Sequence, residues 1–329
     1  MGYPIPAWQV VMDGRDLTER MRPRLIDLTL TEARGKEADQ LDLRIHDNDG
    51  RIALPARGVE IHAAIGWQDS GLIDKGIFVV DEVEYSGSPD IITIRARAAD
   101  LTQPMRRRRE RSWHGSTVGA ILGDIAAEHG LKASIDGALA GIAISHFDQT
   151  GESDANIITR LAERYDAVGT VKAKTLVFKP IGNGVTASGI ILPDARIVRA
   201  DGDQHRYSAI DRDGDYSGVQ AGWTDKSGAS RQVVTVGSAK NAKQLKTTYN
   251  NEAEAREHAT AEQNRIKRGA AKFDYTLALG RPDLYPEQRI TITGFKPEID
   301  NAKWLIKKVT HTITGSGGYI TALEMETAV

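Results

Sequence analysis

The 329-residue chain contains no cysteine. This absence excludes disulfide bonds, thiolate nucleophiles and cysteine-ligated zinc. Neither sign of charge predominates, because the chain has 43 Lys and Arg residues and 45 Asp and Glu residues, which leaves a net charge of only −2. A nearly neutral chain gives no global electrostatic reason to expect a specific nucleic acid or an anionic membrane as its main partner.

Long hydrophobic runs are also missing. No apolar stretch approaches the ~20 residues that a bilayer-spanning helix needs, so we expect no membrane insertion. The first 17 residues lack a basic segment followed by an apolar run, so we expect no secretory signal and synthesis in the cytosol. Hydrophobic residues make up 40% of the chain and charged residues 27%, which is typical of a globular protein. The length predicts two or three domains.

The common catalytic motifs are absent from the sequence. It contains no G-x-S-x-G, no P-loop and no H-E-x-x-H, so local spacing predicts no catalytic residue, no cofactor and no metal site. Asp211, Asp213 and Asp215 resemble the start of a calcium loop, but glycine occupies the fourth loop position and Gly222 the twelfth. We interpret this segment as a β-turn. No pair of carboxylates stands out as a glycosidase pair.

The first hundred residues predict β-strands. Apolar and polar side chains alternate, or nearly alternate, in four segments separated by turn signals: residues 25–30, 40–45, 59–65 and 76–83. A period of two gives each strand one buried and one solvated face. An antiparallel barrel or sandwich is the natural interpretation.

From about Leu101 the apolar period becomes helical. One stripe runs from Val118 to Ala126 and another from Ile157 to Tyr165, and residues 170–178 return to a strand pattern. Residues 101–180 therefore predict a small α/β insert. After a glycine-rich link, strands resume at 216–223 and 231–237, a helix spans 252–268, and the chain is β again from Phe273.

Three segments of the first part resemble three segments of the last part. Residues 57–66 resemble 287–294, residues 78–83 resemble 304–309, and residues 91–93 resemble 319–321, with a longer loop in the second copy. Such a repeat predicts two similar β domains that flank the insert. We place the first at 1–100, completed by part of 181–205, and the second at 206–329.

Two polar clusters allow more than one interpretation. The first holds His146, Asp148, Gln149, Thr150, Glu152, Ser153 and Asp154. Ser153 suits a helix N-cap and Asp154 a first turn, so we favour a structural turn over catalysis. The second cluster is the basic run of Arg106, Arg107, Arg108 and Arg109. A solvated loop is the simpler interpretation, and a possible interface for an acidic protein surface or for nearby DNA is the alternative.

Several motifs resemble one known family. They are RSWHGSTVGAILGDIAAEHGL, the D-Q-T-x-E-S-D run from Asp148 to Asp154, and a W-x-[IV]-x-x-V-x-H…G-Y-x-T tail that contains Trp304 and His311. The chain resembles, over nearly its whole length, the phage late control gene D proteins. These are baseplate hubs of contractile phage tails and R-type bacteriocins, related to the hub part of VgrG. The family often has glycine after the proline of an L-x-P-G turn, where this chain has Glu287.

The resemblance implies a structural, non-enzymatic protein without cofactors. It implies a homotrimer in which each chain gives two tube-like β-barrels, forming a pseudo-sixfold ring. That ring would join the hexameric tail tube protein or a tube-end adaptor to a trimeric tail spike protein, with the tape-measure protein as a further partner. Assembly would take place in the host bacterial cytoplasm, and the mature site would be the virion tail baseplate or a tail-like particle. The D-Q-T-x-E-S-D residues, Trp304 and His311 would then be structural. A peptidoglycan hydrolase and a peptidoglycan-binding tail protein, with a LysM-like insert, are the alternatives.

Overall fold

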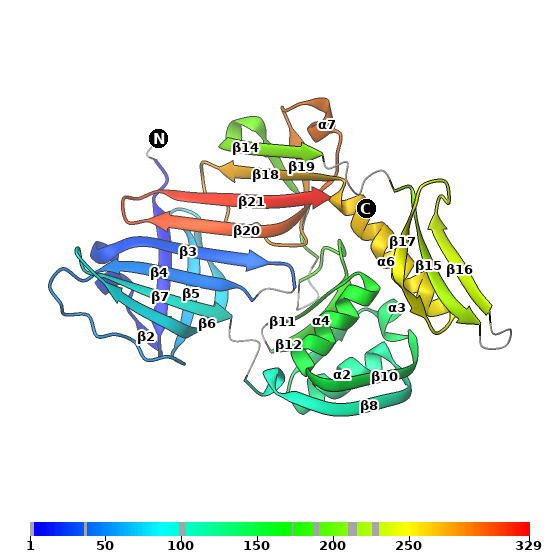
Figure 1. Cartoon of the computed structure of the whole chain (residues 1–329). Helices are drawn as coiled ribbons and strands as arrows, with labels where there is room; N and C mark the ends of the chain where they lie inside the picture. Colours follow the sequence, from blue (N-terminus) through cyan, green and yellow to red (C-terminus); the bar gives the residue numbers. More distant parts are fainter. Residues whose placement is uncertain are drawn as a thin grey trace.

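Strands dominate the computed structural model, which describes residues 3–35, 38–98, 103–172, 174–186, 191–209, 216–225 and 230–329 (Figure 1). The described strands form one sheet of thirteen strands and three smaller sheets. The prediction of a mainly β protein with an α/β insert is confirmed. The proposed turn at Asp211, Asp213 and Asp215 lies outside the described residues.

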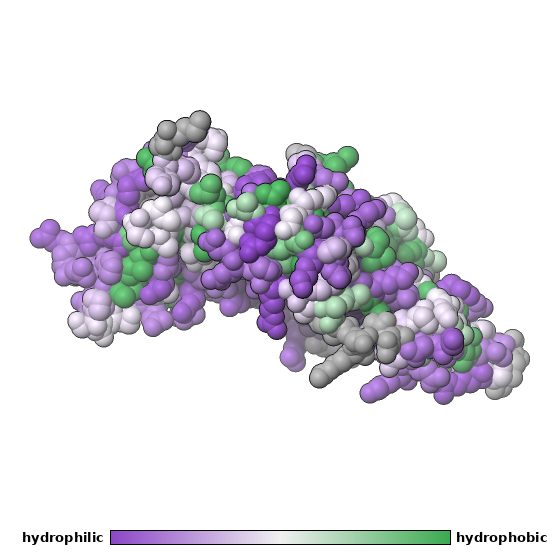
Figure 2. All heavy atoms as spheres, turned by 90° about the horizontal axis from the view of Figure 1, so that it is seen from above, coloured by the Kyte–Doolittle hydropathy of each residue, from purple (hydrophilic) through white to green (hydrophobic). Residues whose placement is uncertain are grey.

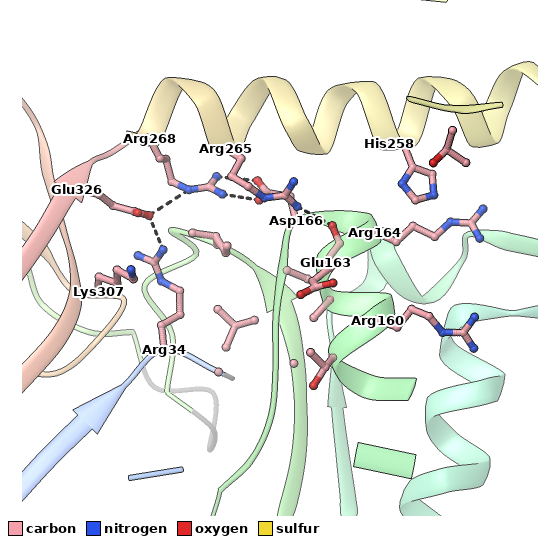
Figure 3. A pocket seen from close by; sticks show the side chains of 18 of the residues that line it. Arg34, Arg160, Glu163, Arg164, Asp166, His258, Arg265, Arg268, Lys307 and Glu326 are labelled. Carbon is pink, nitrogen blue, oxygen red and sulfur yellow. Dashed lines mark hydrogen bonds and ion pairs between the residues drawn. The ribbon is translucent and has the colours of Figure 1, made fainter. Parts of the chain in front are cut away.

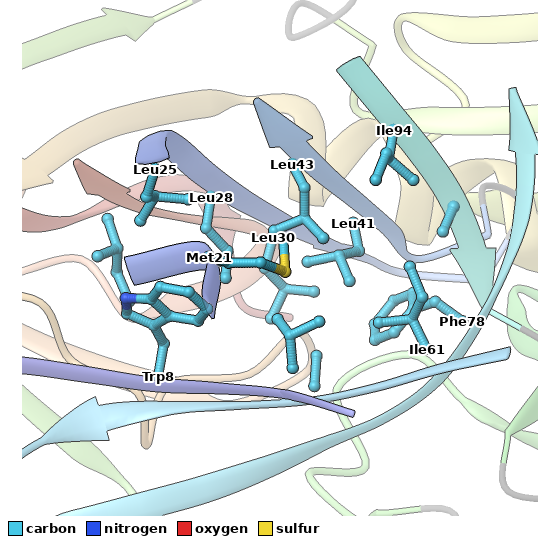
Figure 4. Close-up of a cluster of buried hydrophobic side chains, with 14 of the residues drawn as sticks. Trp8, Met21, Leu25, Leu28, Leu30, Leu41, Leu43, Ile61, Phe78 and Ile94 are labelled. Atoms are coloured by element: carbon cyan, nitrogen blue, oxygen red, sulfur yellow. The ribbon is translucent and has the colours of Figure 1, made fainter. Parts of the chain in front are cut away.

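The N-terminal repeat is a curled antiparallel sheet with strand order β3-β4-β7-β6-β5-β1-β2. The alternation seen in the sequence places large side chains such as Leu28, Ile61 and Phe78 on its inner face, where they are almost fully buried (Figure 4). Met21 of the short helix α1 packs into the same core. The elements of this repeat are β1 (Pro6–Met12), β2 (Arg15–Asp16), α1 (Thr18–Met21), η1 (Arg22–Arg24), β3 (Leu25–Ala33), β4 (Gln40–His46), β5 (Glu60–Trp67), β6 (Gly71–Ser86) and β7 (Ile91–Ala98).

The C-terminal repeat has its own core and the strand order β14-β18-β21-β20-β19-β13. The prediction that part of 181–205 completes the first β domain is wrong. Ile197 pairs with Ile292 in a parallel register, and both side chains are buried in the core of this second repeat. The elements are β13 (Ala195–Val198), η3 (Arg199–Asp201), β14 (Gly202–Ala209), β18 (Ala271–Leu277), β19 (Arg289–Thr293), α7 (Pro297–Asp300), β20 (Trp304–Thr314) and β21 (Tyr319–Thr327).

The two repeats correspond strand by strand. Strands β5, β6, β7, β4 and β3 of the first follow the same order as β19, β20, β21, β18 and β14 of the second. A register shift lies between Val80 and Glu82 in β6 against β7, and between Ile306 and Lys308 in β20 against β21. A second shift recurs near the start of β3 and of β14. Bulges at matching places indicate one architecture used twice.

The third segment of the predicted repeat needs a shift of one residue. Ile92 lies opposite Tyr85, and Thr321 lies opposite His311. The bulges align β6 with β20, so that Tyr85 corresponds to His311 and Ile92 therefore to Thr321. The sequence pattern alone had aligned Ile92 with Ile320. The strand register decides which residues share a face.

The insert carries two small sheets, β10-β8 and β11-β12-β9, packed with α2 and α4 around a separate core. The prediction of a single strand over 170–178 is wrong. These residues belong to two antiparallel strands, β11 and β12, in which Lys172 pairs with Thr175. Lys174 takes a left-handed conformation at its turn, with φ 56°. The elements are η2 (Gln103–Arg106), β8 (Arg108–Thr117), α2 (Val118–Glu128), β9 (Lys132–Ile135), α3 (Gly137–Ala140), β10 (Ala143–Ser153), α4 (Asp154–Tyr165), β11 (Ala167–Lys172) and β12 (Thr175–Pro180).

A fourth unit interrupts the C-terminal repeat. The predicted strands at 216–223 and 231–237 belong to a separate sheet of β15 (Gly218–Asp225), β16 (Ser230–Gly237) and β17 (Ala242–Tyr249), not to the second β domain. This sheet stands apart because it has its own hydrophobic core with the helix α6 (Glu252–Gly269). The small residues Ala255 and Ala259 of α6 pack against Val219 and Val234 of the sheet. We call β15, β16, β17 and α6 the αβ unit. In the part of the chain that the structure describes, no helix is long and apolar enough to cross a membrane.

Candidate functional site

The D-Q-T-x-E-S-D segment lies where β10 ends and α4 begins. Asp148, Gln149 and Thr150 belong to the strand and pair with residues 110–112 of β8, so the prediction of a turn is wrong at these positions. A bulge follows between Thr150 and Glu152. Ser153 then caps α4, since its hydroxyl accepts a hydrogen bond from the backbone N–H of Asn156 at 3.2 Å.

Asp154 is the centre of a buried polar network. It accepts hydrogen bonds from Gln149 Nε2 at 2.9 Å and from the guanidinium of Arg111, and it lies 2.7 Å from His129 Nε2. Burial alone would raise the pKa of Asp154, but the bonds from His129 and Gln149 and the charge of Arg111 hold that pKa below its ordinary value. The network joins β8, β10, α2 and α4, which suits a structural role.

Glu128, His129 and Asp154 place three potential metal-ligand atoms within 4.8 Å of one another. The same carboxylates are engaged by arginine. Arg109 pairs with Glu128, and Arg111 bridges Glu128 and Asp154. Two guanidinium groups already supply positive charge at these oxygens, so the cluster fits an ion-pair network better than a cation site.

The basic run divides into two parts. Arg106 ends the short helix η2, and Arg106, Arg107 and Arg108 have exposed side chains. Arg109 is half-buried in β8 and reaches Glu128 of α2. The first three arginines are therefore available to a partner, whereas the fourth holds the insert together.

Trp304 and His311 lie on β20, and both side chains are fully buried. Trp304 donates a hydrogen bond from Nε1 to the carbonyl oxygen of Ile299 at 2.9 Å, and its ring centroid lies 5.5 Å from that of Phe273. His311 lies where β20 pairs with β3 of the N-terminal repeat, and its Nδ1 is 3.0 Å from Thr321 Oγ1. Trp304 thus fixes the second core, and His311 lies at the junction of the repeats.

A buried ion pair of the N-terminal repeat lies at this junction, against two side chains of the C-terminal repeat. Lys75 Nζ lies 2.7 Å from Glu32 Oε2 and 3.9 Å from the ring centroid of Tyr285, while His311 Nε2 is 3.4 Å from the same carboxylate oxygen. Burial acts to raise the pKa of Glu32, but the charge of Lys75 and the contacts with His311 lower that pKa to about 2. Burial lowers the pKa of Lys75 and of His311. A charge pair of this kind is strongly destabilising when only one partner is removed.

Sequence reasoning missed Glu32 and Lys75. The alternation through Leu28 and Leu30 places Glu32 on the inner face of β3, and a charged residue at a core position is a signal for a buried partner. Lys75 gives no comparable signal. It is 43 residues away in a different strand, and only the folded chain brings it to Glu32.

A cleft with a volume of about 1090 Å³ lies where both repeats, the insert and the αβ unit meet (Figure 3). Arg268 of α6 donates from Nη1 to Asp166 Oδ2 at 2.6 Å and places Nε 3.1 Å from Glu326 of β21. Arg34 also pairs with Glu326. These ion pairs connect the four parts of the chain.

Further arginines of the cleft have partners across it. Arg164 of α4 lies 3.3 Å from Glu254 and from Glu257 of α6, and Arg265 donates to the carbonyl oxygen of Glu163 at 2.9 Å. Charges that are paired between parts of the chain suit a rigid joint.

Beyond the cleft, Figure 2 shows a face where hydrophobic side chains form small groups among hydrophilic ones.

Most of this chain matches a known protein family. A family model described as phage tail baseplate hub (GPD) matches residues 70–317. The chain belongs to this family. The hub protein is also 40% identical, over 362 residues, to a probable baseplate hub protein of Escherichia phage 186, covering 98% of this chain and 92% of that one. A probable baseplate hub protein of Escherichia phage P2 is 41% identical, with 98% and 93% covered.

A solved tail protein shares the fold of this hub protein. It is the 43 kDa tail protein of prophage MuSo2 from Shewanella oneidensis, with a TM-score of 0.70 and 15% identity, covering 97% of this chain and 98% of that one. By its family and its curated relatives, the chain is a baseplate hub protein of phage tails.

The hub turn that contains Glu287 keeps its form without glycine. Glu287 adopts φ 73°, in the left-handed region that favours glycine, and Gly58 occupies the matching place of the first repeat with φ 91°. Each donates its backbone N–H to a corresponding strand residue, Gly58 to Val80 at 2.8 Å and Glu287 to Ile306 at 2.9 Å. The Glu287 carboxylate accepts from the Gly182 N–H and pairs with Arg34, which offsets the backbone strain.

Proposed function

We propose that three copies of this hub protein form a ring with pseudo-sixfold symmetry that joins the tail tube to the spike. The correspondence of the two repeats carries the proposal, because they share strand order and the positions of two bulges. Three chains supply six such repeats. One face of the ring can then match a hexameric tube while the true threefold axis matches a trimeric spike.

The buried ion pairs support a mechanical role. Arg34 of the first repeat pairs with Glu326 of the second, and Arg268 of the αβ unit pairs with Asp166 of the insert. A hub that transmits force between tube and spike needs its two repeats held in one fixed relation. We propose that the partners are the tail tube protein or a tube-end adaptor, the trimeric spike and the tape-measure protein, and that assembly takes place in the host bacterial cytoplasm.

We propose that the protein is not an enzyme. Two of its acidic motif residues have structural partners, since Asp154 binds His129 and Arg111, and Asp148 accepts from Ser112. Zymography on purified cell walls distinguishes a non-enzymatic hub from a peptidoglycan hydrolase. We expect no clearing by the hub protein in a gel where lysozyme clears, and a clearing zone at its mass would overturn the proposal.

Light scattering coupled to size exclusion tests the ring directly. We expect three times the chain mass for the purified protein, or for its complex once the trimeric spike is added. A spike added at equal molar amounts should shift the hub peak and keep a ratio of three to three. A monomer under both conditions would contradict the ring.

A further inference from the structure

The two repeats of one chain meet edge to edge. Strand β20 of the C-terminal repeat pairs with β3 of the N-terminal repeat in an antiparallel register, with Thr310 opposite Thr31 and His311 opposite Leu30. This pairing makes one continuous sheet of the two repeats (Figure 1). It is the contact by which one repeat recognises the next.

The corresponding outer edges of the two repeats are free among the described residues. Strand β6 matches β20, and its residues 82–86 pair with β7 on one side only. Strand β14 matches β3, and it ends the sheet beyond β18. An open strand edge of this length is a template for another strand, and soluble proteins usually protect it.

We propose that the β6 edge of one copy pairs with the β14 edge of a second copy in the register of the β20–β3 junction. The bulges fix the correspondence, so Glu84 takes the place of Thr310 and Ser208 that of Thr31. Glu84 then lies opposite Ser208, and Tyr85 opposite Tyr207. This inference rests on the proposed ring and assigns the strands that close it.

Side chains at the junction are buried, whereas their counterparts at the free edges are exposed. His311 is 0% exposed where β3 covers it, whereas Tyr85 at the matching place on β6 is 51% exposed. On the other edge, Leu28 is fully buried and its counterpart His205 is exposed. Positions that are buried at the junction within one chain are thus exposed at the outer edges of the two repeats.

A cleft lies beside the free β14 edge. Its volume is about 790 Å³, and its lining includes Tyr207, Phe295 and Ile299. In the proposed register Tyr85 of the second copy arrives opposite Tyr207, where an aromatic ring can pack into this cleft. Covering an exposed tyrosine and an apolar cleft together gives the contact a hydrophobic contribution.

One pair of opposite charges comes within reach in this register. The β6 edge carries exposed Glu84, which lies 3.6 Å from Arg95 of β7, and the β14 edge carries exposed Arg206. Arg206 falls diagonally from Glu84 on the same face, a spacing that long side chains can bridge. The register therefore brings opposite charges together.

Cysteine crosslinking tests the register without background, because the chain has no cysteine. We would introduce Glu84→Cys and Ser208→Cys together and oxidise the purified protein. Facing residues of an antiparallel pair lie about 4.5–5.5 Å apart at Cα, which suits a disulfide. We expect covalent dimer and closed trimer bands on a non-reducing gel, which disappear on reduction.

Two matched pairs control the experiment. Thr31→Cys with Thr310→Cys, the corresponding pair within one chain, should give an intramolecular disulfide and no covalent oligomer. Glu84→Cys with Tyr207→Cys, one residue out of register, should crosslink weakly. Light scattering on the same samples separates the two proposals. A trimer, with or without the spike, that lacks the Glu84–Ser208 crosslink overturns the register and keeps the ring, and a monomer under both conditions overturns both.

Discussion

Arg268 of α6 donates hydrogen bonds through both terminal nitrogens to Asp166, the residue that ends α4. Both side chains are almost fully buried, so one ion pair ties the αβ unit to the insert. Asp166 has φ 53°, a left-handed conformation that asparagine also tolerates. Asp166→Asn therefore removes the charge while keeping the backbone.

For Asp166→Asn we expect the free energy of unfolding to fall by about 2–3 kcal/mol, since a buried guanidinium loses a charged acceptor. Glu326 continues to pair with Arg268, which keeps the loss below that of a complete break. Urea unfolding followed by circular dichroism measures the change. Glu252→Gln removes the exposed partner of Arg256 on the same helix and should leave stability almost unchanged. Equal stability of both variants would show that the buried pair does not hold the joint.

The pair of Glu32 and Lys75 gives a second prediction. Glu32→Gln leaves the Lys75 ammonium buried without its anion, and we expect a loss of about 3–5 kcal/mol. Adding Lys75→Met removes the orphaned charge, so the double variant should recover part of that loss. Thermal unfolding of the two single variants and the double variant gives the coupling energy. Losses that simply add would contradict a direct interaction.

Local rules account for much of this fold. The alternation in residues 25–30 and 59–65 predicted β3 and β5, and the apolar stripe after Ser153 predicted α4, because each pattern is read within one element. What failed depends on distant partners. Strand β14 could not be assigned to the second repeat without knowing that it pairs with β18.

The candidate site shows the same division. Ser153 was identifiable as a cap because its partner Asn156 is three residues away. The joint of Arg34, Asp166 and Arg268 could not be predicted, since its members are separated by more than a hundred residues and carry no shared motif. Charged residues at such spacing acquire meaning only after the sheets and helices are packed.

The pH dependence of stability should include a contribution from His258. Its ring stacks on Tyr249 with centroids 4.4 Å apart, and burial together with the nearby Arg164 lowers its pKa to about 4. Glu254 acts in the opposite direction, and Arg265 adds to the lowering. The unfolded chain binds a proton near pH 6.5, whereas the folded chain binds it only near pH 4. Stability is therefore lost as pH falls from 6.5 to 4.

His258→Phe keeps the aromatic stack and removes the titration. We expect the midpoint of urea unfolding to fall less steeply between pH 6.5 and 4 in this variant than in the native chain. Exposed His62, which pairs with Asp74, serves as the comparison through His62→Phe. A slope unchanged by His258→Phe would show that other groups account for the acid sensitivity.

Glu287 separates backbone strain from ion pairing. Glu287→Gly relieves the left-handed conformation, a gain of about 1 kcal/mol, but removes the partner of Arg34 and the acceptor of the Gly182 N–H. Because both lost contacts are buried, we expect a net loss of about 1–2 kcal/mol. Asp13→Gly, at an exposed residue with φ 46°, relieves similar strain without a buried ion pair and should stabilise slightly. If Glu287→Gly stabilised the protein as well, the carboxylate would contribute nothing to this joint, and glycine would be the better residue in both repeats.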